Sequence, residues 1–188
     1  MPCGGPWDRN AVIETDRLLL RPLSLHDAPA VAALFAGDWE AVKQTGRIPY
    51  PPDEGPIRDW LKLHEDEHAN GFAVLLKPAG GFVGLVGYGG DGETAEVGYA
   101  FGRPFWGRGF ATEAVAALCA RARARGLVWV EAFSFVENPA SARVLEKAGF
   151  SELGTVTKSY PDRGGPRRVR HFRLWFRDRA RSGPSQNA

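Results

Sequence analysis

Apolar residues along the chain switch repeatedly between a two-residue and a helical period, which predicts strands interleaved with helices. Helical spacing predicts helices over 26–37, about 53–69 and 109–125, and a short helix that Asn138-Pro139 opens and Gly149 closes. Strands are predicted over 17–21, 72–77, 82–88, 93–101, 128–133, 150–159 and 169–176, with residues 78–81 as a hairpin turn. This order predicts an α+β domain with a mixed sheet.

Composition narrows the class of protein. The chain has 188 residues, 44% of them hydrophobic and 24% charged, as expected for one globular domain. Its longest apolar runs, 30–36 and 114–120, are far shorter than the roughly 20 residues that cross a bilayer, and no signal-peptide pattern opens it. Cys3 and Cys119 form no CxxC pair, so neither a disulfide framework nor a thiolate metal site is indicated. We expect a soluble, cytoplasmic protein with no membrane contact.

Charge is unevenly distributed along the chain. Residues 1–150 carry a net charge of −4 and residues 151–188 a net charge of +6. A solvated last strand with an Arg-rich end explains this excess, and an anionic small-molecule ligand fits as well. A nucleic-acid-binding domain is usually far more basic overall, so we do not expect that function.

A glycine-containing turn lies between a predicted strand and a predicted helix, with the sequence Trp106-Gly107-Arg108-Gly109-Phe110-Ala111-Thr112. Glycines let backbone N–H groups point into a concave loop, and a helix start adds positive partial charge, so the turn suits a pyrophosphate. The GxGxxG triplet is incomplete and no P-loop GK[ST] follows. Taken alone, the pattern fits a plain tight turn into a buried helix equally well.

Two further places can carry chemistry. Strand alternation puts Glu96, Gly98 and Ala100 on one face, where a carboxylate beside two small residues can line a cavity and act as a general base. A solvent-facing strand explains this glutamate as well. Asn138 is a suitable helix N-cap, and Ser141 in the first helical turn is either a solvated hydroxyl or a proton donor.

A rival motif is the segment His64-Glu65-Asp66-Glu67-His68, which matches the zinc-protease pattern H-E-x-x-H. It ends a helix rich in solvent-type charges, and no HxxGxxH extension follows. A third ligand would have to be a carboxylate such as Glu93 or Glu96. We therefore expect a surface histidine pair and no metal, with a zinc hydrolase as the remote alternative.

Together, three segments resemble the GCN5-related N-acetyltransferase (GNAT) superfamily, and within it the ribosomal-protein N-terminal acetyltransferase-like (Rim-type) branch. The segments are residues 15–23 with Asp27, residues 96–99 followed by 103–114, and residues 138–150. The resemblance covers nearly the whole chain. It implies a mostly antiparallel central sheet flanked by helices in one domain, 15–178, between an N-terminal extension, 1–14, and a tail, 179–188.

The resemblance also implies a function. Members transfer an acetyl group from acetyl-CoA, the co-substrate, to a primary amine by direct attack in a ternary complex, without a metal. Glu96 matches a general base, and Ser141 matches a general acid towards the CoA thiolate. The positions matching cofactor-binding residues are Tyr99, Phe101, Trp106, Gly107, Arg108, Gly109, Phe110, Ala111, Thr112 and Asn138.

Departures from the family pattern leave some roles open. Trp106 stands where many members have Arg or Gln. Leu145 stands where many members have the tyrosine that acts as general acid, so the general acid here is either Ser141 or solvent. The acceptor is either a peptide N-terminus or a small-molecule amine, and a homodimer is compatible with the family. The alternative function is a non-catalytic CoA-binding or regulatory module whose basic last strand contacts RNA or protein.

Overall fold

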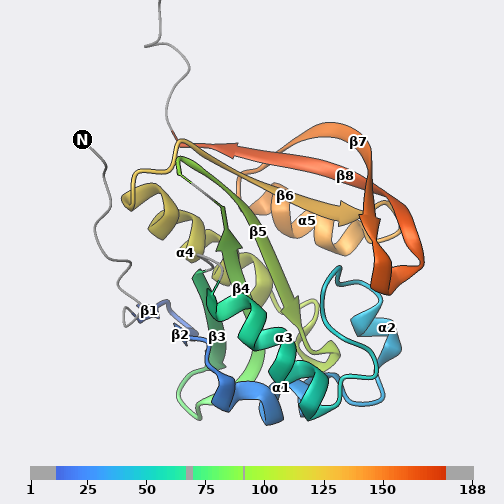
Figure 1. Ribbon diagram of the computed structural model, residues 1–188. Coiled ribbons are helices and arrows are strands. Elements are labelled where there is room, and N and C mark those ends of the chain that lie inside the picture. Colours follow the sequence, from blue (N-terminus) through green and yellow to red (C-terminus); the bar gives the residue numbers. More distant parts are fainter. Residues whose placement is uncertain (1–11, 67–69, 91, 177–188) are drawn as a thin grey trace, which may run out of the picture.

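The computed structural model describes residues 12–66, 70–90 and 92–176, which form an eight-stranded sheet in the order β1-β2-β3-β4-β5-β6-β8-β7 (Figure 1). Neighbouring strands are antiparallel except β5 and β6, which are parallel. The predicted mixed, mostly antiparallel sheet is therefore confirmed. The strands are β1 (Ile13–Glu14), β2 (Leu18–Pro22), β3 (Asn70–Leu76), β4 (Gly81–Gly89), β5 (Thr94–Phe101), β6 (Trp129–Phe135), β7 (Ser151–Tyr160) and β8 (Gly165–Trp175).

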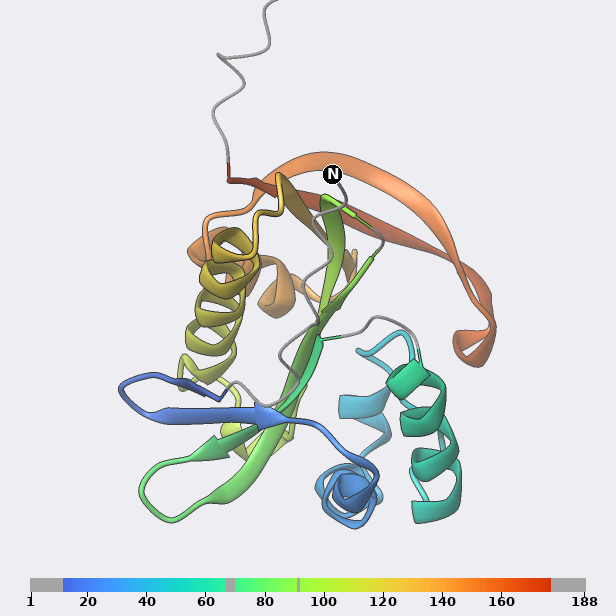
Figure 2. The same cartoon turned by 60° about the vertical axis from the view of Figure 1, so that its left-hand side comes forward.

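Helices cover the sheet on both faces (Figure 2). On one face α1 (Ala28–Phe35) and α3 (Glu54–Asp66) enclose a core that includes Phe35, Ile57 and Ala100, and α2 (Trp39–Val42) lies beside them. On the other face α4 (Phe110–Ala124) and α5 (Pro139–Lys147) enclose a larger core. Single 3₁₀ turns are η1 (Leu25–Asp27), η2 (Arg103–Phe105) and η3 (Pro161–Arg163). Among the described residues, no helix is long and apolar enough to span a membrane.

Each predicted helix and strand is present, with ends that differ by a few residues from the prediction. Two elements were not predicted. Strand β1, which falls in the expected N-terminal extension, pairs Ile13 with Leu20, and α2 is one turn that Asp38 caps through its side chain, accepting from Ala41 N at 3.0 Å. Both are too short for a hydrophobic period to show.

The sheet opens between β5 and β6. The two strands pair only at Thr94 with Trp129, Ala95 with Val130 and Glu96 with Glu131. Beyond these pairs β5 stays with β4 as far as Phe101, and β6 stays with β8 as far as Phe135, so the facing edges diverge (Figure 1). We call this divergence, between residues 97–101 and 132–135, the V-shaped opening; its apex is the Glu96–Glu131 pair.

Strands β7 and β8 form a long hairpin that curls towards α2 (Figure 1). At its tip the buried Arg163 donates hydrogen bonds to the carbonyl oxygens of Thr45 (2.9 Å) and Ile48. Tyr160 lies against Gly46, where an added Cβ would come within 2.6 Å of the ring. The hairpin tip is thereby fixed to residues 43–48, the first part of the segment between α2 and α3.

Candidate active site

The glycine turn leads from the open end of β5 into α4. Gly107 and Gly109 have φ angles of 71° and 80°, in the left-handed region that only glycine adopts readily. Trp106 Nε1 donates to Phe101 O at 2.7 Å and ties the turn to the end of β5. Gly109 is the N-cap of α4, and it supplies no side-chain hydrogen bond to the first N–H groups. This helix start can therefore receive an anion at residues 107–112.

Ion pairs hold the start of α4 against the first strands. Glu113 accepts from Thr15 Oγ1 (2.6 Å) and Arg17 Nε (2.7 Å), while Arg17 Nη1 donates to Arg108 O at 2.9 Å. Burial acts to raise the pKa of Glu113, but the hydrogen bonds from Thr15 and Arg17 outweigh it and leave the pKa below its usual value. The Arg17 and Arg108 guanidiniums both lie over the Phe110 ring beside the turn, and Arg17 is paired with Glu113.

Side chains from β5 and α5 meet across the V-shaped opening. Tyr99 Oη lies 2.8 Å from Ser141 Oγ and donates to Ser141 O at 3.1 Å. Asn138 Oδ1 accepts from Ser141 N at 3.0 Å, which confirms Asn138 as the N-cap of α5. Burial raises the pKa of Tyr99, so this phenol keeps its proton. Leu145 is fully buried in the core.

The contact between Tyr99 and Ser141 was not predicted from the sequence. Alternation put Tyr99 on an apolar face with Val97 and Phe101, both of which are buried in the core around α4 and α5. The phenol oxygen of Tyr99 is the polar atom among these apolar side chains. A tyrosine among buried apolar residues needs a hydrogen-bond partner, and this is the signal that could have indicated the contact.

Glu96 lies at the apex of the V-shaped opening, with its side chain 34% exposed. Lys158 Nζ donates to Glu96 Oε2 at 2.7 Å, and Arg47 Nη2 lies 3.7 Å from Oε1. As predicted, Glu96 shares a face with Ala100, which packs towards α1 and α3. The carboxylate therefore faces the side on which residues 43–48 and the β7–β8 hairpin meet.

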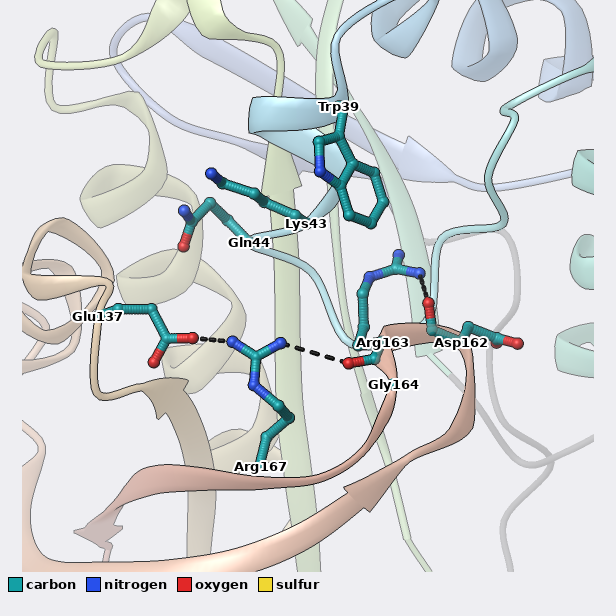
Figure 3. A pocket seen from close by; sticks show the side chains of 8 residues that line it. All are labelled: Trp39, Lys43, Gln44, Glu137, Asp162, Arg163, Gly164 and Arg167. Carbon is teal, nitrogen blue, oxygen red and sulfur yellow. Dashed lines mark hydrogen bonds and ion pairs between the residues drawn. The ribbon is translucent and has the colours of Figure 1, made fainter.

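A pocket of about 380 Å³ opens where the hairpin tip meets α2 (Figure 3). Trp39, Lys43 and Gln44 line it from the α2 side, Glu137 from the segment before α5, and Asp162, Arg163, Gly164 and Arg167 from the hairpin. Arg167 forms an ion pair with Glu137 across it. The pocket therefore lies beside Glu137, the residue that precedes the N-cap of α5.

Much of the basic charge of the last strand is compensated within the fold. Arg167 pairs with Glu137, Arg170 lies 3.8 Å from Glu152, and Arg173 lies 3.4 Å from Glu131. The Arg173 guanidinium also lies 4.0 Å from the centre of the Trp129 ring. In the part of β8 that the structure describes, these contacts favour the solvated-strand interpretation over a continuous anion-binding stripe.

The candidate zinc motif lies mostly beyond what the structure describes. His64 and Glu65 belong to the end of α3, but only their backbone is described, and His68 is outside the described residues, as is Cys3. Among the described residues, no group of three or more His, Cys, Asp or Glu side chains can hold a metal ion. Cys119 is a buried free thiol whose pKa burial raises to about 12.

Comparison with known proteins identifies the family. The family model for the acetyltransferase (GNAT) domain matches residues 17–151. The uncharacterized N-acetyltransferase p20 of Bacillus licheniformis is 31% identical over 150 residues, covering 76% of this chain and 83% of p20. YoaA of Bacillus subtilis (strain 168), also named an N-acetyltransferase, is 28% identical over 162 residues, covering 82% of this chain and 91% of YoaA.

Solved structures share the fold. A GNAT-family acetyltransferase from Bacillus anthracis superposes with a TM-score of 0.76 at 24% identity, covering 88% of this chain and 99% of that one. RimL, a ribosomal L7/L12 α-N-protein acetyltransferase solved with coenzyme A, superposes with a TM-score of 0.75 at 19% identity, covering 88% and 98%. The chain belongs to the GNAT family of acetyltransferases.

Proposed function

We propose that the protein transfers the acetyl group of acetyl-CoA to a primary amine, from a peptide N-terminus or a small molecule, by direct attack in a ternary complex. The observation that carries the proposal is the combination of the V-shaped opening with the uncapped start of α4. An extended strand edge and a ring of backbone N–H groups suit a long ligand with an anionic end. Glu96 lies at the apex of the opening, at the end away from the start of α4.

The residues present fit acetyl-CoA, which supplies the activated acetyl thioester. The backbone N–H groups of residues 107–112 would hold the pyrophosphate, and Arg108 adds positive charge there. The edge of β5 that faces the opening, at Tyr99 and Phe101, would pair with the amide groups of the pantetheine arm, apart from Phe101 O, which accepts from Trp106 Nε1. Asn138 would keep the start of α5 in place through its cap and offer its amide nitrogen to the same arm.

Catalysis by this chain needs a base and an acid. Glu96 would take a proton from the incoming amine, because an ammonium has no lone pair with which to attack. Ser141 would return a proton to the leaving thiolate. The Tyr99 phenol has a single proton; if it were donated to Ser141 Oγ at 2.8 Å instead of to Ser141 O at 3.1 Å, the serine proton would be free to point away from Tyr99 into the opening.

The acceptor would enter on the side of α2 and the β7–β8 hairpin, where Glu96 faces residues 43–48. Mixed charge lines the pocket there, with Glu137 and Asp162 among Lys43, Arg163 and Arg167. Trp39 adds an apolar ring to this lining, so the pocket would suit an acceptor with both polar and apolar parts. A cytoplasmic location, a homodimer and the domain limits 15–178 stay predictions from the sequence.

The test is CoA release from acetyl-CoA with a panel of amines: a peptide with a free N-terminus, a polyamine and an aminoglycoside. Glu96→Gln should lower turnover roughly 10²–10⁴-fold while acetyl-CoA affinity stays unchanged, because the base acts only in the chemical step. Glu93→Gln, an exposed position near the start of the same strand, is the matched control and should leave turnover unchanged. Full turnover in Glu96→Gln would remove the base assignment. Acetyl-CoA binding without CoA release for any amine would favour the binding module.

A further inference from the structure

One of the five lysines of the chain forms an ion pair with Glu96, the proposed general base. Lys158, on β7, places Nζ 2.7 Å from Glu96 Oε2 and 3.5 Å from the centre of the Phe133 ring. Glu96 is the last residue of β5 that pairs with β6, and Phe133 lies two residues past the last pair on β6. The Lys158 amine therefore bridges the two strands at the apex of the V-shaped opening.

The orientation of the proposed cofactor site would place the thioester of acetyl-CoA near this amine. Strand β5 enters the glycine turn after Phe101, so the turn lies at the open end of the V-shaped opening. An arm that starts at residues 107–112 and follows the unpaired edge of β5 can run only towards Val97 and the apex. Its reactive end therefore approaches Glu96, where a primary amine of the protein is already in place.

We propose that Lys158 is an intramolecular acceptor, so that the protein acetylates its own Lys158 from acetyl-CoA; this rests on the proposed function. Glu96 takes a proton from the Lys158 ammonium, and the freed lone pair attacks the thioester carbonyl. A C–N bond forms and the C–S bond breaks, with the electron pair leaving on sulfur as thiolate. The nitrogen then releases a second proton and the thiolate takes one up, by way of Ser141 or solvent, to give CoA. Lys158 becomes a neutral acetamide, and Glu96 returns its proton to solvent.

A lysine in an ordinary surface ion pair should not be acetylated in preference to other lysines. The chain contains such a lysine, Lys43, for comparison with Lys158. Lys43 Nζ lies 2.6 Å from Glu40 Oε2, and its side chain is 37% exposed against 30% for Lys158. The two lysines thus agree in carboxylate distance and in exposure. They differ in their position in the fold: Lys43 follows α2, whereas Lys158 lies at the apex of the V-shaped opening. Only a mechanism that depends on the apex distinguishes them.

The experiment incubates the full chain with acetyl-CoA and follows acetylation by intact mass and peptide mapping. We expect one acetyl group per chain, on Lys158, with Lys43 modified at least about tenfold more slowly. The first-order rate constant should not change on tenfold dilution of the protein, because the reaction is intramolecular. Glu96→Gln should slow it roughly 10²–10⁴-fold. Lys158→Arg, which keeps the positive charge at Glu96, should abolish the addition while acetyl-CoA still binds.

Several results would overturn the inference. Equal rates at Lys43 and Lys158 would mean chemical acetylation by exposure, and a rate constant that falls on dilution would mean reaction between molecules. An unmodified Lys158 in a protein that releases CoA with an external amine would overturn this inference and leave the proposed function standing. A protein that neither binds acetyl-CoA nor releases CoA would overturn both.

Discussion

The two sides of the V-shaped opening are built in different ways. On the cofactor side, residues 97–112 follow one another in the chain, and the groups that face a ligand are mostly backbone N–H and C=O. On the acceptor side, side chains join segments far apart in the sequence: Glu96 meets Lys158, and Arg163 meets Thr45, 118 positions away. The ligand-facing groups of the cofactor side are mostly local backbone groups, which long-range contacts such as Arg17–Glu113 support, whereas the acceptor side presents side chains from distant segments.

This difference suggests a division of labour. Backbone groups recognise a ligand whatever the side chains are, which suits a cofactor shared by a whole family. Side chains on loops and hairpin tips change without disturbing the sheet, which suits an acceptor that differs from one member to the next. Changes on one side should therefore leave the function of the other side intact, and the following variants test that separation.

The largest effect is expected for Arg163→Ala on the acceptor side. It leaves the carbonyl oxygens of Thr45 and Ile48 without their donor in a buried place, which should lower the free energy of unfolding by about 2–4 kcal/mol. With the hairpin tip released, KM for the amine should rise and the Kd for acetyl-CoA should not change. Urea unfolding and an acetyl-CoA titration measure both.

The matched control for Arg163→Ala is Arg168→Ala, an exposed arginine on β8 of the same hairpin. Its effect on unfolding should stay within about 0.5 kcal/mol. If Arg163→Ala weakened acetyl-CoA binding as much as it raised KM for the amine, the two sides would not be separate.

Next in size is Gly109→Val on the cofactor side. Valine at a φ of 80° costs about 1–3 kcal/mol, because its Cβ meets the backbone, and the turn must shift to relieve it. We expect the Kd for acetyl-CoA to rise roughly 5- to 150-fold. Gly80→Val is the matched control, since Gly80 has a φ of 71° in the β3–β4 turn with nothing within 4 Å of an added Cβ. Equal loss of binding in both variants would show general strain rather than a cofactor cradle.

How far the sequence predicts each side follows from the same difference. The glycine turn, the Asn138 cap and the strands were predicted, because glycine positions, caps and hydrophobic periods are local signals. The Arg163–Thr45 contact was not predicted, nor was the contact of Tyr99 with Ser141, 42 positions away. The excess of basic residues in the last strand is visible in the sequence. Their partners depend on how the β7–β8 hairpin curls, and no local sequence pattern encodes that curl.

A pH-dependent effect is expected from Asp27, which anchors the start of α1 on the acceptor side. Its side chain is 5% exposed and accepts from Arg21 Nη1 (2.9 Å) and Ser24 N (2.9 Å). Burial acts to raise the pKa of Asp27, but the hydrogen bonds from Arg21 and Ser24 bring it below the ordinary 3.8. The stability this carboxylate contributes is therefore present above about pH 4 and is lost as the pH falls through the lower folded-state pKa.

Urea unfolding at a series of pH values checks this. The wild-type protein should lose more stability between about pH 5 and pH 3 than Asp27→Asn does, because the variant lacks the titrating group. Asp59→Asn, at an exposed position on α3, should follow the wild type. A wild-type curve parallel to that of Asp27→Asn would contradict the assignment.

The smallest effect is expected at the pair that spans the opening. Ser141→Ala should lower kcat roughly tenfold with little change in Kd for acetyl-CoA, because solvent can protonate the thiolate in place of the hydroxyl. Tyr99→Phe, which only removes the partner of that hydroxyl, should cost less. Steady-state kinetics with the best amine of the panel measures both, and a kcat equal to that of the wild type in Ser141→Ala would assign the acid role to solvent.

The most direct test of the division between the two sides is backbone hydrogen exchange with and without acetyl-CoA. The account predicts slower exchange at residues 97–101 and 107–112 when acetyl-CoA binds, and little change at residues 43–48 and 161–167. Slower exchange at residues 43–48 and 161–167, with no slowing at residues 107–112, would place acetyl-CoA on the acceptor side and contradict the proposed division between the two sides.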